Sequence, residues 1–325
     1  MSAPPVYTYP ELADCAACGA RRFRAAARLR FPAFPDAFQL LECASCGLLF
    51  NSPRLADQSA LYRSDYYVFA ESEAGRQGAA MSQFRALVDR LGADRLRGKR
   101  VLEIGAALGH LSSLLARAGA RVRGVELCGH VAQAARERFQ ADVFAGSLAA
   151  FREKEREARF DIVVACEVLE HVPAQPAFLR DCRAVLAPGG VLVGTTPNAA
   201  ARSRGAWGDD WEGFNPFHIY LYTPSALRAA LGRAGFPSPE IESSAAEPAP
   251  GGVGLRRARR RLVRALDSAG IAPVLRNVVR RFRRAAREPR PFEQRPLDEI
   301  LREAAPSFKD ADAGGEKLRF VARAE

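Results

Sequence analysis

The segment 101–116, VLEIGAALGHLSSLLA, constrains the fold more than any other part of the chain. A short apolar run enters a turn marked by Gly105 and Gly109, and a helical pattern follows directly. Glycine lets a ligand approach the backbone closely, and the N-terminus of a helix directs free N–H groups at that ligand. A second apolar run, 121–126, ends at Glu126, where a carboxylate can accept hydrogen bonds from ribose hydroxyls. Alone, such a strand–glycine–helix unit on an α/β sheet is a weak signal, and it could bind NAD, FAD or no cofactor.

Two segments further along the chain narrow the choice. The apolar run 160–166 continues into EVLEHVP at 167–173, and segment 186–198, LAPGGVLVGTTPN, places a Pro-Gly-Gly turn before another apolar run. In order and spacing, these motifs resemble the class I S-adenosylmethionine-dependent methyltransferases over 98–245 and the last ten residues. The resemblance implies an α/β fold, a Rossmann-like seven-stranded sheet with helices on both faces.

The resemblance also implies S-adenosylmethionine (SAM) as the cofactor. In that family the glycine turn holds the methionine part, the acid after the second strand holds the ribose, and the end of the third strand lies near the adenine. The implied cofactor-binding residues are Glu103, Gly105, Ala107, Gly109, Glu126, Ser147 and Cys166. Ala107 stands where the family has its middle glycine, and alanine avoids positive φ, so we expect the turn to differ slightly there.

Four of the seven cysteines form two Cys-x-x-Cys-Gly pairs, which are Cys15, Cys18, Cys43 and Cys46. This spacing is typical of a structural zinc site of the ribbon type. The competing interpretations are two incidental cysteine pairs and a redox dithiol, but a thioredoxin-like motif belongs inside an α/β unit, which this N-terminus is not. The arrangement resembles a group of bacterial methyltransferases of surface-polysaccharide and natural-product pathways. We expect the ribbon to pack on the methyltransferase core.

A possible second metal site follows the fourth apolar run. Its residues are Glu167, Glu170, His171 and the later His218. The pattern resembles metal-dependent small-RNA 2′-O-methyltransferases, in which such residues bind magnesium (Mg), and ubiquinone-pathway O-methyltransferases share its first part. Two alternatives stay open. The catalytic residues Glu167, His171 and His218 could supply a general base for the acceptor, or the histidines only pack and form hydrogen bonds.

The charge of the chain is concentrated in one segment. Between 255 and 295 lie fourteen arginines and three acidic residues, an excess that equals the formal net charge of +11 for the whole chain. Apolar residues recur there at helical spacing, which predicts two basic amphipathic helices on an anionic membrane surface. The alternative is a solvated face over a packing stripe. Nucleic acid is disfavoured as a partner, because apolar residues interrupt the arginines at helical period.

The chain contains no apolar run of 18 residues and no secretory signal, so we expect a cytoplasmic protein, peripheral on the inner membrane surface if the basic helices dock. The expected organisation is a zinc ribbon (1–58), a helical cap and linker (59–97), a SAM-binding core (98–245), an arginine-rich helical insertion (246–314) and a final edge strand (315–325).

The expected function is transfer of a methyl group to a hydroxyl or acidic carbon of a small-molecule, sugar or lipid-linked acceptor, for example in polysaccharide biosynthesis. The alternatives are a catalytically inactive methyltransferase-like module that binds an anionic partner, and a metal-dependent 2′-O-methyltransferase that acts on RNA.

Overall fold

The structure is a computed structural model that describes residues 7–8, 14–30, 38–52, 54–55, 72–211, 213–215, 217–244, 291–303 and 307–324. The two predicted basic helices of the arginine-rich segment lie outside these residues, except for the last part of that segment at 291–295. Among the helices in the described ranges, none combines the length and the apolar character needed to cross a bilayer.

A central eight-stranded sheet forms the body of the protein, in the order β13-β12-β14-β10-β9-β6-β7-β8. Its strands are β6 (Arg100–Ile104), β7 (Arg121–Glu126), β8 (Val143–Ala145), β9 (Phe160–Cys166), β10 (Leu186–Pro197), β12 (Glu240–Ser244), β13 (Phe308–Asp310) and β14 (Lys317–Arg323). Strands β6 to β10 are parallel, whereas β14 runs antiparallel to both of its neighbours. The Rossmann-like sheet predicted from the sequence is confirmed, with β13 as an additional strand.

The last strand does not lie where the sequence placed it. Strand β14 is antiparallel, as expected, but it pairs with β10 on one side and β12 on the other, so the prediction of a final edge strand is wrong. The alternating sequence of β14 suggests one solvated face. Its central arginine, Arg319, is nevertheless buried, because its guanidinium donates to Glu242 Oε2 and Asp89 Oδ2, each at 2.8 Å. These two carboxylates therefore stabilise the buried guanidinium in place of the water that would surround it at the protein surface.

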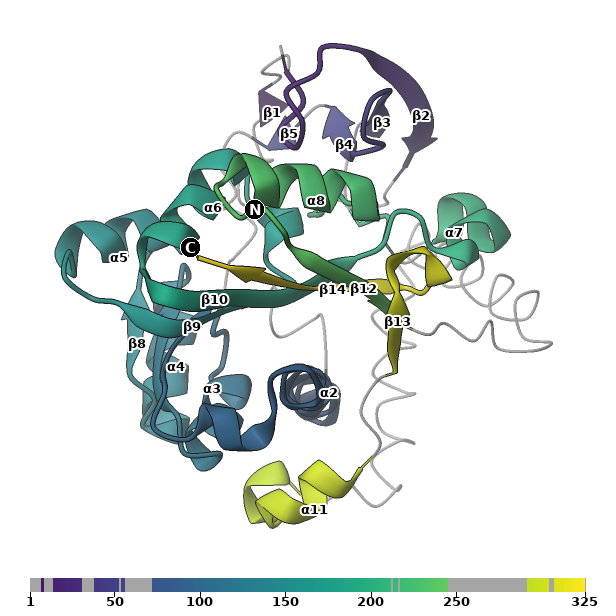
Figure 1. Ribbon diagram of the computed structural model, residues 1–325. Helices are drawn as coiled ribbons and strands as arrows, with labels where there is room; N and C mark the ends of the chain where they lie inside the picture. Colours follow the sequence, from purple (N-terminus) through teal and green to yellow (C-terminus); the bar gives the residue numbers. More distant parts are fainter. Residues whose placement is uncertain are drawn as a thin grey trace, which may run out of the picture.

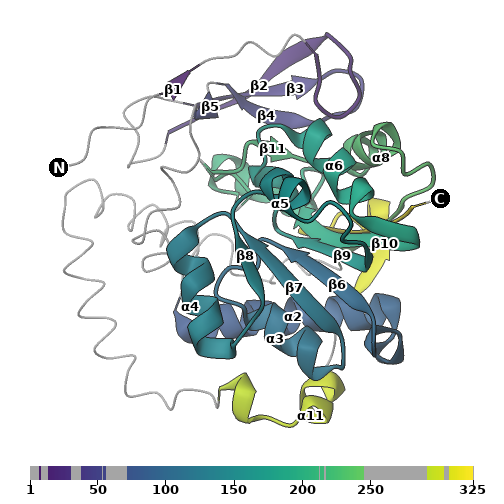
Figure 2. The same cartoon turned by 90° about the vertical axis from the view of Figure 1, so that its left-hand side faces the viewer.

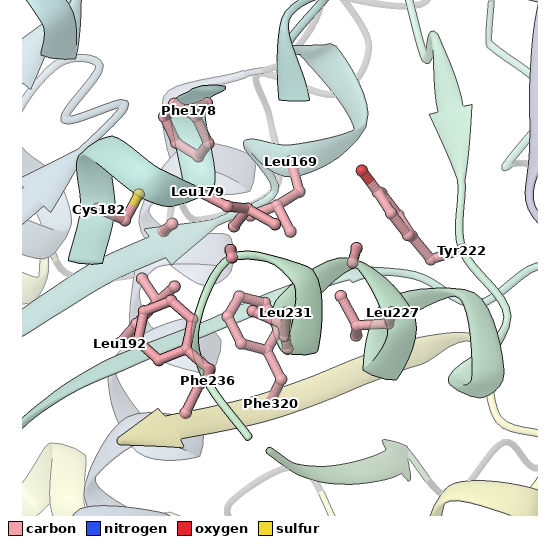
Figure 3. Packing of buried hydrophobic residues seen from close by; sticks show 14 of the residues in the cluster. Leu169, Phe178, Leu179, Cys182, Leu192, Tyr222, Leu227, Leu231, Phe236 and Phe320 are labelled. Atoms are coloured by element: carbon pink, nitrogen blue, oxygen red, sulfur yellow. The ribbon is translucent and has the colours of Figure 1, made fainter. Parts of the chain in front are cut away.

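Helices cover both faces of the sheet (Figures 1 and 2). One face carries α2 (Glu73–Leu91), α3 (His110–Arg117) and α4 (Gly129–Phe139), and the other carries α5 (Leu148–Lys154), α6 (Gln175–Ala184) and α8 (Pro224–Arg233). On the second face, leucine and phenylalanine side chains of α6, α8 and the strands interlock (Figure 3). Helix α2 buries Phe84 and Leu87 against the first face. The short elements outside these layers are η2 (Ala93–Leu96), η3 (Leu169–His171), α7 (Arg202–Trp207) and η4 (Gly208–Asp210).

The N-terminal segment forms a second, four-stranded sheet in the order β11-β4-β3-β2. Its strands are β2 (Phe23–Leu29), β3 (Phe38–Cys43), β4 (Leu49–Ser52) and β11 (Tyr220–Leu221), while β1 (Tyr7–Thr8) pairs separately with β5 (Arg54–Leu55). Strand β11 lies between α7 and α8 of the core, the part of the protein that contains the central sheet, so the core completes the ribbon sheet. Cys15, Cys43 and Cys46 also belong to the same hydrophobic cluster as Leu227 of α8. The ribbon therefore packs on the core, as the sequence predicted.

Segment 291–303, where the arginine-rich insertion returns, docks on the first face below α2 and α3 (Figure 2). It contains η5 (Phe292–Gln294) and α11 (Leu297–Arg302), and the following β13 and η6 (Ala311–Ala313) add to the sheet edge. Phe292 is fully buried and stacks on Phe139, with ring centroids 5.9 Å apart. Arg117 donates to the carbonyl oxygens of Phe292, at 2.9 Å, and of Arg295. The far end of the insertion is thus anchored to the core.

Candidate active site

The glycine turn between β6 and α3 has the left-handed backbone that close ligand approach requires. Gly105 and Gly109 have φ of 74° and 82°, and Ala107 between them has φ of 47°. A Cβ at Gly105 would lie 2.8 Å from Val168 Cγ2, so that position excludes a side chain. The expectation that the turn differs at Ala107 is wrong, because the alanine itself takes the left-handed conformation. That conformation costs about 1–2 kcal/mol for an alanine, and the Ala107 N–H bond to Glu126 Oε2 at 2.9 Å helps to offset it.

Glu126 lies at the end of β7, as predicted, and is almost fully buried. Its Oε2 accepts the Ala107 N–H and its Oε1 accepts the Cys128 N–H, both at 2.9 Å. Burial raises the pKa of Glu126, while these two N–H groups act in the opposite direction. Each carboxylate oxygen keeps a lone pair that can accept a hydroxyl proton. The geometry fits a carboxyl group that binds the two hydroxyls of a ribose.

Leu127 is a candidate cofactor contact that the sequence did not indicate. Its side chain is 49% exposed, the one large exposed hydrophobic residue recorded in the described part of the chain. It directly follows Glu126 and offers an apolar surface beside that carboxyl group, which suits the flat face of a purine. Sequence alone carries no signal for it, because a leucine after a strand is ordinarily buried.

Glu103 is a buried carboxyl group on β6, the strand that leads into the turn. The hydroxyl of Ser112 on α3 donates to its Oε2. Burial, with a smaller contribution from the nearby charge of Glu126, raises the pKa of Glu103 to about 8. Glu103 is therefore largely protonated at neutral pH, in contrast to an ordinary surface glutamate.

The structure gives Ser147 and Cys166 clear local surroundings. Ser147 Oγ accepts the Ala150 N–H at 3.1 Å and so caps α5, beside the end of β8. Cys166 ends β9 and is partly buried. Burial and the charge of the neighbouring Glu167 raise the pKa of Cys166 to about 12, so it is a neutral thiol. Both residues remain predicted cofactor contacts by their position at the carboxyl ends of strands.

Glu167 follows β9 with a left-handed backbone, φ 55°, a conformation often found at functional sites. Its Oε1 accepts the Thr195 hydroxyl at 2.7 Å, and its Oε2 lies 3.1 Å from Lys317 Nζ. Burial opposes ionisation, but the charge of Lys317 outweighs it together with these hydrogen bonds, and the net pKa of Glu167 is lowered. The sequence did not single out Lys317, because it lies at the far end of the chain and reaches the site only through β14.

Three of the four residues of the predicted second metal site come together. Ligand atoms of Glu170, His171 and His218 all lie within 4.8 Å of one another, whereas Glu167 pairs with Lys317 instead. The two imidazole rings meet edge to face with centroids 4.9 Å apart. Glu170 is fully buried; its Oε2 accepts the Thr196 hydroxyl at 3.0 Å, and its Oε1 has no hydrogen-bond partner among the described residues.

Backbone carbonyls fix the tautomer of both histidines. His171 Nδ1 lies 3.0 Å from the Phe217 oxygen, and His218 Nδ1 lies 2.8 Å from the Gly213 oxygen. A carbonyl only accepts, so each Nδ1 carries the proton and each Nε2 keeps a free lone pair, as in metal-ligating histidines.

Burial decides the protonation of this cluster. Burial, helped by the charge of His218, lowers the pKa of His171 to about 4, and burial also lowers the pKa of His218. Burial and the charge of Glu167 raise the pKa of Glu170 well above its usual range. At neutral pH both imidazoles are therefore neutral, and the ionised form of Glu170 is disfavoured. His171 is a weak general base at such a pKa, but it is always available as a ligand.

The four predicted zinc ligands converge on one point. Cys15 Sγ lies 3.6 Å from Cys46 Sγ, Cys18 Sγ lies 3.6 Å from Cys43 Sγ, and all four sulfurs lie within 4.8 Å of one another. Sulfurs at tetrahedral positions about 2.3 Å from a zinc ion are about 3.8 Å apart, so the arrangement fits that ion. Gly19 and Gly47 have φ of 79° and 74°, consistent with a knuckle turn after each cysteine pair.

The sheet order, the left-handed turn and the carboxyl group at the end of β7 define a Rossmann-like protein that binds a nucleotide-type cofactor. The chain belongs to the methyltransferase domain family, whose domain matches residues 76–237. Among curated proteins, it is 34% identical over 153 residues to a probable S-adenosylmethionine-dependent methyltransferase of Mycolicibacterium smegmatis, covering 47% of this chain and 56% of that protein. It is 31% identical over 166 residues to a ubiquinone biosynthesis O-methyltransferase of Xanthomonas euvesicatoria, covering 47% and 69%.

The matched part of the chain spans about half the length of the first curated relatives that it matches. Solved structures show the same fold at low identity. The plantazolicin methyltransferase BpumL, crystallised with SAH and a triazolic analogue, is 12% identical with a TM-score of 0.53, covering 82% of this chain and 94% of that one. A SAM-dependent methyltransferase from Archaeoglobus fulgidus is 15% identical with a TM-score of 0.50, covering 79% and 99%.

The raised pKa of Glu103 predicts a pH dependence of stability. The unfolded chain releases this proton near pH 4.5, whereas the folded protein keeps it to about pH 8, so the free energy of unfolding falls as pH rises through that interval. Each unit of pKa difference corresponds to about 1.4 kcal/mol. Glu103→Gln, which stays neutral, should flatten this decline in urea unfolding between pH 5 and pH 8. The exposed Glu137→Gln is the matched control, and equal slopes for wild type and Glu103→Gln would refute the assignment.

Proposed function

We propose that this protein transfers a methyl group from SAM to a hydroxyl group of a small-molecule acceptor. The observation that carries the proposal is that the left-handed turn, Glu126 and the Glu170–His171 pair all follow carboxyl ends of parallel strands, where ligands of open α/β sheets bind, and that His218 joins this pair. The named O-methyltransferase relative supports a hydroxyl acceptor. An acidic carbon remains the second acceptor type, since alignment of the sulfonium carbon with either nucleophile supplies much of the rate.

The residues of the cofactor site would contact different parts of SAM. The Gly105–Gly109 turn would approach the methionine part, Glu126 would bind the ribose hydroxyls and Leu127 would cover the adenine. The neutral thiol of Cys166 and the protonated Glu103 would add little negative charge beside the sulfonium. Glu167, which follows Cys166 in the chain and has a lowered pKa, would be the ionised carboxyl group of the site.

The cysteine cluster, in our proposal, holds one structural zinc ion. Its four sulfurs have the spacing of a tetrahedral site, and their knuckles lie inside the core shared with α8. Such an ion supplies folding energy and takes no part in the chemistry.

The Glu170–His171–His218 cluster would hold a divalent cation such as Mg. The observation that favours it is Glu170 Oε1, a buried oxygen without a hydrogen-bond partner among the described residues and 4.0 Å from His171 Nε2, because a buried polar atom without a partner is costly. A bound cation supplies acidification of the acceptor hydroxyl, which suits a cluster whose histidines are weak bases. If a histidine instead acts as general base, His218 is the better candidate, because the lowered pKa of His171, about 4, makes His171 a weak base.

The acceptor class is proposed only as a small molecule. Sugar and lipid-linked acceptors of polysaccharide pathways stay open, as does docking of 255–295 on an anionic membrane, which would make a cytoplasmic enzyme peripheral. A catalytically inactive module that binds an anionic partner and an RNA 2′-O-methyltransferase are the alternatives. Labelled SAM incubated with the protein and fractionated cell extract separates these acceptors by the fraction that takes up the label.

Glu126 provides the test of cofactor binding. By calorimetry, wild-type protein should bind SAM, and Glu126→Ala should weaken binding by about 1.5–3 kcal/mol, since it removes a charge-assisted hydrogen-bonded contact. Glu137→Ala, an exposed substitution on α4, should leave the dissociation constant unchanged. Absence of SAM binding by the wild type at millimolar cofactor would reject the enzyme assignment itself.

The zinc assignment predicts about one zinc per chain in elemental analysis of protein purified under reducing conditions. Cys43→Ser should lose the ion and lower the free energy of unfolding, because one of four ligands is missing. Cys128→Ser is a matched control, since this cysteine stands at the N-cap position of α4, outside the four-sulfur cluster, and serine is a good N-cap. Zinc-free wild-type protein of full stability would show that the cluster has another role.

The second cation is tested with Mn²⁺, a paramagnetic substitute for Mg, in zinc-loaded protein. Glu170→Gln and His218→Ala should each weaken Mn²⁺ binding by roughly tenfold or more. The exposed His130→Ala, on α4, should bind as the wild type does. If all four proteins bind Mn²⁺ equally, the Glu170–His171–His218 cluster holds no cation, and its histidines act as a general base or only pack and form hydrogen bonds.

A further inference from the structure

One ribbon side chain reaches across to the segment that carries His218. Asn51, in β4, is almost fully buried, and its Nδ2 donates to the carbonyl oxygen of His218 at 2.7 Å. Its backbone N–H donates to the Ile219 oxygen at 3.0 Å. Both contacts join residues 167 or more positions apart in the chain, and they extend the β4–β11 pairing by one residue.

The same segment is held from the opposite side by the turn that carries the other two members of the cluster. The Ile219 N–H donates to the backbone carbonyl oxygen of Glu170 at 2.7 Å, and His171 Nδ1 donates to the backbone carbonyl oxygen of Phe217 at 3.0 Å. Residues 217–219 therefore lie between β4 and η3. A continuous run of hydrogen bonds connects the ribbon sheet to Glu170, His171 and His218.

The position of β4 is in turn fixed by the second cysteine knuckle. Cys46 lies three residues before β4, and its carbonyl oxygen accepts the hydroxyls of Thr223 and Ser225, both at 2.8 Å. Thr223 also caps α8, so the start of that helix and the knuckle are joined. The knuckle, β4 and the His218 segment thus form one connected unit across the interface.

We propose that Asn51 is a positioning residue for the His218 segment, so that the ribbon is a structural part of the acceptor site. The amide of Asn51 would set the distance of the His218 imidazole from His171 and Glu170 while touching neither cofactor nor acceptor. This role rests on the proposed methyltransferase function. Glu126 and the glycine turn lie outside the connected unit, so the role concerns the acceptor side and leaves cofactor binding untouched.

Asn51→Asp separates positioning from packing. Aspartate has nearly the shape of asparagine, but its carboxylate cannot donate to the His218 carbonyl and repels it when ionised. Asn51→Ala removes the same hydrogen bond without adding charge. Ser52→Ala is the matched control, because neighbouring side chains on a strand point to opposite faces. If only packing mattered, the aspartate substitution would behave as the wild type.

Hydrogen exchange followed by mass spectrometry gives the primary measurement. In Asn51→Asp and Asn51→Ala, amides of 213–222 should exchange roughly tenfold faster, the factor expected for loss of one buried hydrogen bond, while those of 101–126 stay unchanged. Ser52→Ala should match the wild type. Unchanged exchange at 213–222, or equally faster exchange throughout the chain, would overturn the proposal.

Cofactor binding and methyl transfer complete the test. The SAM dissociation constant of Asn51→Asp should stay within about twofold of the wild type, whereas label transferred from SAM to cell extract should fall at least tenfold. Full transfer despite a loosened 213–222 would overturn the role in the acceptor site. A wild-type protein that binds no SAM would refute the methyltransferase function, and the exchange measurement would still decide whether Asn51 positions the segment.

Discussion

The structure depends on the insertion of β14 between β10 and β12. This strand comes from the end of the chain, yet it joins the two halves of the sheet and buries Arg319 against Glu242 and Asp89. It also delivers Lys317 to Glu167, so the last part of the sequence sets the charge at the end of β9. Arg319 can be buried in the sheet because Glu242 and Asp89 are partners of opposite charge.

The same arrangement separates two carboxyl groups that are three residues apart. Glu167 lies beside Lys317, which lowers its pKa, whereas Glu170 has no such partner and its pKa is raised. Two neighbouring carboxyl groups whose environments shift their pKa values apart often take different roles. A bound cation at Glu170 would oppose the upward shift of its pKa, since a metal ligand must be deprotonated.

Much of this could be predicted from local sequence. The turn at 101–116, Glu126 and the two cysteine pairs depend on spacing within short segments, and the structure places them as expected. The positions that failed depend on distant neighbours. The interior place of β14 requires Glu242 and Asp89 around Arg319, the departure of Glu167 from the cluster requires Lys317, and the left-handed Ala107 is held by Glu126. Local pattern contains none of these partners.

The anchor at Phe292 has a consequence for the topology of the chain. The segment between Ser244 and Phe292 leaves the sheet from β12 and returns to the opposite face, where Phe292 is enclosed by His110 and Phe139. Beyond it the chain still has to supply β14 to the interior of the sheet. A single peptide-bond break between these two points would therefore not divide the protein into separable halves, because each fragment carries strands that the other needs. Both ends of the segment are therefore attached to the folded body, at Ser244 and at Phe292.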